Sequence, residues 1–138
     1  RESRRFSGKY VMNISDLREA RRFPDVVVHK AQFVVDIHNP VGGGQANGIA
    51  EYVDAYDIPW RSLVPQKMEN LILAGRCISG THEAMASYRV MAIAMAIGEA
   101  AGIGAALAID HDVTPENLDV KYIQKALMDK GAVLFDEK

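Results

Sequence analysis

The chain has 138 residues, a formal net charge of −2 and one cysteine. The near-neutral charge argues against nucleic acid as the main partner, because phosphate binding needs a concentrated basic face. A single cysteine excludes an intrachain disulfide and a cysteine-rich metal site. A chain of this length can bury roughly two thirds of its unfolded surface as one domain.

Residues 1–66 are predicted to be mostly strands. One short helix over residues 16–22 interrupts them, with Ser15 as its N-cap and Pro24 beyond its end. Runs rich in β-branched and aromatic residues favour the strands, which are predicted at residues 6–12, 26–28, 31–37, 52–58 and 61–64.

Residues 67–138 are predicted to hold one more strand, followed by helices. The apolar residues 71–74 are stopped by Gly75 and Arg76, which is typical of a buried strand that ends in a tight turn. A polar loop then leads into an apolar helix over residues 89–108.

Two signals predict the end of the chain. Thr114 with Pro115 indicates a further helix start, which we expect to be short. Asp119 is placed to cap a final helix that runs to Lys130 and stops at Gly131.

The helix over residues 89–108 has the length of a membrane span. Glu99 and small residues on every face favour a buried helix of a soluble domain instead. Because glycine is unfavourable inside a helix by about 1 kcal/mol relative to alanine, we expect Gly98 and Gly102 to lie close against neighbouring backbone. The sequence therefore predicts no membrane contact.

Four segments carry a family resemblance. They are Tyr56-Asp-Ile-Pro-Trp-Arg-Ser-Leu-Val-Pro65, Asn70-Leu-Ile-Leu-Ala-Gly-Arg-Cys-Ile-Ser79, His82-Glu-Ala84 and Arg89-Val-Met91. In order and spacing they resemble the C-terminal part of bacterial FAD-dependent oxidoreductases, flavoproteins of the glutathione-reductase and fumarate-reductase kind. Residues 1–5 and 20–25 fit the same family, so the resemblance covers nearly the whole chain.

The resemblance implies an α/β fold, which would be mixed α+β as an isolated piece. Residues 1–66 would belong to the substrate or cap region. Residues 67–138 would form the C-terminal end of a doubly wound FAD-binding domain, with its last strand and its helices.

One element of such flavoproteins is missing from the sequence. Their GxGxxG fingerprint grips the FAD pyrophosphate after a strand and before a helix, whereas the glycines at 42–44 follow Asn39-Pro40 in a loop. The chain also begins at Arg1 rather than at a methionine. We therefore expect a C-terminal fragment whose partner is the missing N-terminal part, and which is inactive and binds FAD poorly alone. Any signal peptide would lie on that part, so the compartment stays open.

The resemblance also implies the residues that hold the flavin. Arg89, Val90 and Met91 would contact the pyrimidine edge of the ring, where a helix N-terminus stabilises negative charge. The turn at residues 74–76, which comprises Ala74, Gly75 and Arg76, would run beside the ribityl chain and the pyrophosphate. Relatives often place an acidic residue at the position of Arg76, so only the backbone contact carries over.

Two side chains are candidates for catalysis. His82 has the chemistry to move a proton as hydride passes to or from the flavin, although it could equally bond only to backbone. Arg61, like Arg89, could clamp a substrate carboxylate or form a structural ion pair.

The other histidines suggest less chemistry. His38 stands beside Asp36 as a ligand pair, but no third ligand follows at a metal-site spacing, so no metal is expected. We place His38 away from the flavin edge, and we expect His29 and His111 at the surface.

Two other classes of function remain open at this stage. The chain could belong to a carbohydrate-active protein such as a polysaccharide (xanthan) lyase, which would need an exposed aromatic platform. It could also be a non-catalytic interaction module that binds a partner through its Ala/Gly-rich helix. The small-molecule substrate, the electron donor or acceptor and a possible homodimer are not specified by the sequence.

Overall fold

The computed structural model describes residues 5–39, 41–42 and 50–136. These residues form a mixed α+β fold with four α-helices and one two-stranded antiparallel sheet, as expected. In chain order the elements are α1 (Ile14–Arg18), β1 (Val26–Ala31), β2 (Tyr56–Pro59), the 3-10 turns η1 (Trp60–Ser62) and η2 (Gly75–Cys77), α2 (His82–Tyr88), α3 (Met91–Asp110) and α4 (Val120–Asp129).

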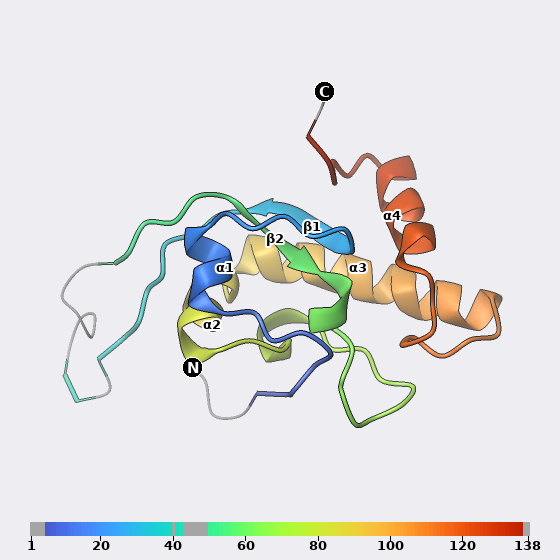
Figure 1. The fold of residues 1–138 in the computed structure, drawn as a ribbon, viewed down its shortest axis with the longest axis horizontal. Helices are drawn as coiled ribbons and strands as arrows, with labels where there is room; N and C mark the ends of the chain where they lie inside the picture. The colour runs from blue at the N-terminus through green and yellow to red at the C-terminus, as the bar shows by residue number, and fades with distance from the viewer. Residues whose placement is uncertain (1–4, 40, 43–49, 137–138) are drawn as a thin grey trace.

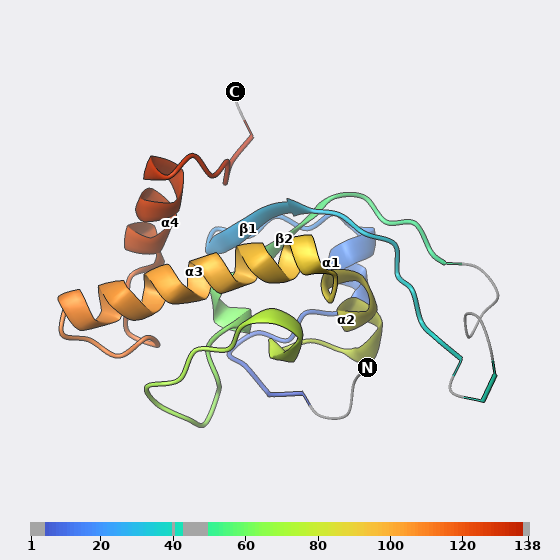
Figure 2. The same cartoon turned by 180° about the vertical axis from the view of Figure 1, so that it is seen from behind.

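Helix α3 runs along the long axis of the molecule, and the other elements pack around it. The ribbon of β1 and β2 lies across the first half of α3, while α1 and α2 lie at one end and α4 at the other (Figures 1 and 2). A two-stranded ribbon is marginal by itself in water. Its burial against α3 therefore supplies the stability that the ribbon lacks.

Strands β1 and β2 pair through Val26↔Pro59, Val28↔Ile58 and Ala31↔Tyr56, with irregular register between these pairs. Every residue of β2 is buried, including the charged Asp57. Strand β1 continues through His29 and Lys30, where the sequence had predicted a break between two strands.

Several predicted strands at residues 6–37 are wrong. Within the described chain, residues 6–12 make only isolated bridges, and residues 32–37 make one, between Val35 and Glu51. Helix α1 begins earlier than predicted because Asn13, not Ser15, caps it. The Asn13 side chain accepts from the backbone N–H groups of Ser15 and Asp16, and the Asp16 carboxylate accepts from Asn13 N–H in return, which completes a capping box.

The predicted strands at residues 61–64 and 71–74 are also absent from the part of the chain that the structure describes. Residues 60–62 form the turn η1, in which the Ser62 hydroxyl donates to the Pro59 carbonyl at 2.7 Å. In residues 71–74 only Leu73 is buried, and its backbone N–H donates to the Leu63 carbonyl at 2.7 Å. No described strand lies beside this segment to complete a ladder.

The single helix predicted over residues 89–108 is two helices. Arg89 ends α2, and Val90 has extended backbone angles, φ −75° and ψ 154°, before α3 begins at Met91. His82 and Glu83 therefore lie in the first turn of α2 rather than in a loop. The Thr81 hydroxyl caps α2 by accepting from Ala84 N–H.

The packing predicted for the glycines of α3 is wrong in this structure. Apart from chain neighbours and the nearby backbone of α3 itself, no described atom lies within 4 Å of the position that a Cβ would take at Gly98 or Gly102. Gly104 is instead the tightly packed glycine, because a Cβ there would overlap the indole of Trp60. Helix α3 is long and apolar enough to cross a membrane, but core helices of soluble proteins share these properties.

Helix α4 matches its prediction. The Asp119 carboxylate caps it by accepting from Lys121 N–H at 3.0 Å, and Gly131 follows its end with φ +95°. The side-chain amide of Gln124 donates to the carbonyls of Pro24 and Val26, which ties α4 to the start of β1. Thr114 and Pro115 lead only into a turn.

Candidate functional site

The junction between α2 and α3 carries a cluster of three charged or titratable side chains. Arg89 Nη2 donates to both the carbonyl and the carboxylate of Asp36, each at 2.9 Å. The same carboxylate oxygen, Oδ2, accepts from His38 Nε2 at 2.8 Å. We call Arg89, Asp36 and His38 the junction cluster.

The sequence indicated the pair of His38 and Asp36 but not its contact with Arg89. It placed His38 away from Arg89, whereas the structure joins the two through Asp36. The partners are 53 residues apart along the chain, so no local pattern indicates the contact. The side chains of Arg89 and Asp36 are 15% and 20% exposed, and that of His38 is 41% exposed. The cluster is therefore half-buried but within reach of a ligand.

The start of α3 adds a partial positive charge next to this cluster. Val90 stands at the N-cap position and has no polar side chain, so it leaves the first N–H groups of α3 without a side-chain cap. Met91, which is predicted to contact the cofactor, is 83% exposed. Val90 is half-buried and packs at the edge of the core.

The turn at residues 74–76 has an open backbone. Gly75 adopts φ +67°, which only glycine adopts without strain, and apart from its chain neighbours no described residue has an atom within 4 Å of its absent Cβ. Ala74 and Arg76 are exposed. Turn η2 packs beside α3, the helix that begins at Met91.

The predicted catalytic residues lie elsewhere. The Arg61 guanidinium is held by both carboxylate oxygens of Asp25, at 2.9 and 3.1 Å, and lies over the ring of Tyr10 at 5.3 Å. This ion pair raises the pKa of Arg61. The structure thus pairs Arg61 with Asp25, and its catalytic role stays a prediction.

His82 is exposed in the first turn of α2. Its neighbour Glu83 has a lowered pKa, chiefly because its own backbone N–H and the Thr81 hydroxyl donate to its carboxylate. Such donors are typical of a capped helix start. The role of His82 in proton transfer also stays a prediction.

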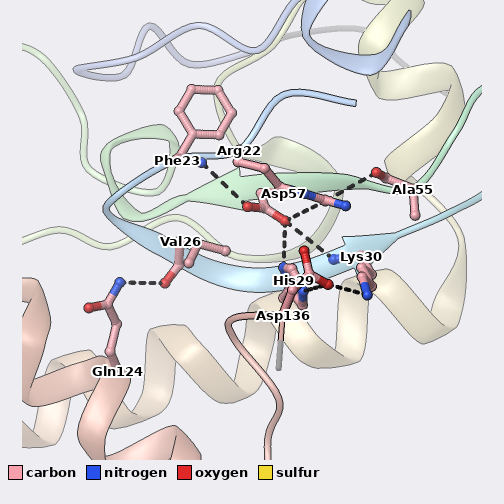
Figure 3. Close-up of polar contacts among 9 residues, drawn as sticks. All are labelled: Arg22, Phe23, Val26, His29, Lys30, Ala55, Asp57, Gln124 and Asp136. Carbon is pink, nitrogen blue, oxygen red and sulfur yellow. Dashed lines mark hydrogen bonds and ion pairs between the residues drawn. The ribbon is translucent and has the colours of Figure 1, made fainter. Parts of the chain in front are cut away.

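A second cluster, which the sequence missed, surrounds the buried carboxylate of Asp57 in β2. Asp57 Oδ1 accepts from Arg22 Nη1 at 3.0 Å and from His29 Nδ1 at 2.8 Å, and Oδ2 accepts from Phe23 N–H at 3.3 Å (Figure 3). The His29 side chain is only 3% exposed, so the surface position expected for it is wrong. We call Asp57, Arg22 and His29 the strand cluster.

Neither a tryptophan platform for sugars nor a metal-binding group is found among the described residues. Trp60, the only tryptophan, is buried against Gly104 and does not form an exposed platform for sugar rings. Among residues 5–39, 41–42 and 50–136, no group of three or more His, Cys, Asp or Glu side chains is placed to hold a metal.

Comparison with protein families gives one match. A family model described as FAD dependent oxidoreductase matches residues 1–127, which is most of the chain. No curated protein and no solved structure matches the chain. The last eleven residues, which include the tail that follows α4, lie outside the matched range.

Proposed function

Because the chain belongs to the FAD dependent oxidoreductase family, we propose that it is the C-terminal part of a flavoenzyme, of the glutathione-reductase and fumarate-reductase kind. When bound, the flavin supplies hydride transfer to or from a small-molecule substrate. The family match over residues 1–127 is the observation that carries this proposal. In it, the N-terminal part that carries the pyrophosphate-binding fingerprint is the missing partner.

Two features of the described residues fit an FAD-like ligand. The backbone at Gly75 is open on the side where a Cβ would stand, so a ligand can approach it closely. The start of α3 presents N–H groups without a side-chain cap beside the junction cluster. We propose that Ala74, Gly75 and Arg76 hold the ribityl side of the ligand, and that Arg89, Val90 and Met91 hold the ring edge.

The exposed face of α3 supports the proposal that this chain is part of a larger assembly. Met91, Met95 and Ile109 are all more than 70% exposed on it. Gly98 and Gly102 offer bare backbone there, although glycine costs a helix about 1 kcal/mol relative to alanine. In the proposal the missing N-terminal part covers this face; a second copy of the chain is the alternative occupant.

We propose a structural role for Arg61 in place of the catalytic role expected from the sequence. Arg89 remains the candidate for the ring edge, whereas the Asp25 carboxylate already accepts from Nε and Nη2 of Arg61. His82 is exposed and can exchange protons with solvent or substrate. We propose His82 as the proton carrier and Arg61 as a residue that holds η1 to Asp25.

FAD titration followed by flavin fluorescence tests the proposal. The chain alone should bind FAD no more tightly than micromolar, because only the ring and ribityl sides of the site are present. The chain produced together with the segment encoded upstream should retain FAD on purification. A sub-micromolar dissociation constant for the chain alone would contradict the fragment reading, and a longer protein without flavin would contradict the flavin reading.

A pair of glycine variants makes the test specific to the site. Gly75 and Gly131 both have positive φ, +67° and +95°, and apart from their chain neighbours no described residue has an atom within 4 Å of either Cβ position. Gly75→Ala and Gly131→Ala therefore introduce the same kind of backbone strain. In the longer protein only Gly75→Ala should lower the affinity for FAD, and equal losses in both variants would remove Gly75 from the site.

A further inference from the structure

Asp36 holds Arg89 at two points. The same guanidinium nitrogen, Nη2, donates to the Asp36 carbonyl and to its carboxylate, both at 2.9 Å. Charge-assisted hydrogen bonds of this kind are stronger than neutral ones, and two of them to one residue restrict the side chain to one orientation. The orientation of Arg89 is therefore set by the segment that carries Asp36.

Asp36 also changes the charge at the start of α3. Arg89 and Asp36 are both mostly buried, with 15% and 20% of their side chains exposed, so solvent screens the pair less than a surface pair. The carboxylate offsets the charge of the guanidinium. A ligand at the start of α3 thus meets a nearly neutral ion pair, hydrogen-bonded to His38, rather than a lone cation.

We propose that Asp36 is a positioning residue that holds Arg89 at the start of α3 and, by offsetting its charge, lowers the reduction potential of a flavin bound there. The flavin's position rests on the proposed function. A bound ligand that gains negative charge on reduction is favoured by a nearby cation and disfavoured by a nearby carboxylate. Removing either partner of the pair should therefore move the potential in opposite directions.

Potentiometry on the flavin-loaded longer protein tests this inference. Asp36→Asn should raise the flavin potential, because Arg89 then acts as an unbalanced cation. Arg89→Gln should lower it, because Asp36 is left without that counter-charge. Each shift should reach about tenfold in the equilibrium between oxidised and reduced flavin, which is about 30 mV for two electrons. The double variant should return close to the unsubstituted protein.

A matched control and a measurement without flavin separate this inference from the proposed function. Asp129→Asn removes the carboxylate of an exposed pair with Lys125 on α4 and should leave the potential unchanged. In the chain alone, nitrogen NMR of the Arg89 guanidinium should show slow hydrogen exchange that Asp36→Asn makes fast.

Each outcome has one reading. If the longer protein holds no flavin, the proposed function fails, whereas the NMR result still decides whether Asp36 holds Arg89. If flavin is bound but the two potentials do not move, or move in the same direction, the charge-balance inference is overturned while the proposed function stands. Fast guanidinium exchange in the unsubstituted chain would overturn the positioning role.

Discussion

The molecule contains the same three residue types, aspartate, arginine and histidine, in two clusters. The aspartate and histidine are more buried in the strand cluster, whereas its Arg22, at 42%, is more exposed than Arg89 of the junction cluster, at 15%. In the strand cluster, the side chains of Asp57 and His29 are each 3% exposed, and the carboxylate lies between β1 and β2 (Figure 3). In the junction cluster, Asp36 is 20% and His38 is 41% exposed. The difference shows that the surroundings of such a trio, rather than its residue types, decide what it can do.

The Asp57 carboxylate of the strand cluster is closed to ligands by the protein itself. The Asp57 carboxylate already accepts from two side chains and from the backbone of Phe23. Buried carboxylates are tolerated only when their hydrogen bonds are made. We infer that this cluster holds β1, β2 and the segment before β1 together, whereas the junction cluster remains open to a ligand at the start of α3.

The largest effect should come from removing the two carboxylates in turn. Asp57→Ala should lower the free energy of unfolding by about 3–5 kcal/mol, because it leaves the buried His29 and the N–H of Phe23 without their acceptor. Asp36→Ala should cost less, about 1–3 kcal/mol, because the Arg89–Asp36 pair is partly exposed, at 15% and 20%, and His38 can turn to water. Urea unfolding of both variants measures the difference. Equal losses of unfolding free energy would contradict the distinction between a structural strand cluster and an accessible junction cluster.

The elements of the fold differ in how far the sequence could predict them. The spacing of Asp119, Lys130 and Gly131 predicts α4 correctly, because caps and glycine stops are local signals. Residues 71–74 have the composition of a buried strand, but no described strand lies beside them. Because strand pairing joins segments that are distant in the chain, the sequence of 71–74 alone could not show that the partner strand is missing.

For the site residues too, the sequence indicates local features but not contacts between distant segments. The resemblance identifies Gly75 and Arg89 by position, and their backbone settings, an open φ +67° turn and a helix junction, suit a binding role. Their partners could not be predicted, because Asp36 reaches Arg89 from 53 residues away. A charged Asp57 among the apolar residues of a strand was the one available signal for the strand cluster.

Tyr56, next to Asp57 in β2, reports whether the region between the strand cluster and the junction of α2 and α3 is buried. Its hydroxyl lies 2.8 Å from Ser87 Oγ, and because Ser87 donates to the Phe33 carbonyl at 2.6 Å, Tyr56 is the donor. Burial raises the pKa of Tyr56 to about 12 from a usual 10.0. The neutral phenol is thus favoured by folding, and its contribution is present below pH 10 and lost as the pH rises toward 12.

Alkaline unfolding measures this contribution. The unsubstituted chain should lose up to about 2–3 kcal/mol of stability between those two pH values, and Tyr56→Phe should not show that part of the loss. Tyr52→Phe is the matched control, since Tyr52 is 86% exposed. If Tyr56→Phe and the unsubstituted chain lost stability in parallel, the hydroxyl would be open to water and the burial between the two clusters would be incomplete.

The smallest effect is expected where the strand cluster meets the tail after α4. Asp136 pairs with Lys30 Nζ and lies 3.5 Å from His29 Nε2, which has no hydrogen-bond partner among the described residues (Figure 3). The hydrogen bond from Lys30 is the main reason that the pKa of Asp136 is lowered. The pair therefore contributes above the usual pKa of an aspartate, and its contribution is lost as the pH falls through the lowered value.

Because the Asp136 side chain is more than half exposed, Asp136→Asn should leave the global unfolding midpoint unchanged. Exposed ion pairs contribute little to stability. Hydrogen exchange should instead quicken locally in residues 132–136, and Lys30→Gln should produce the same local change. A drop in the midpoint approaching that of Asp57→Ala would mean that the tail seals the strand cluster from water. In that case the burial of His29 would depend on Asp136, which lies outside the family match, and His29 would become accessible whenever Asp136 moves away.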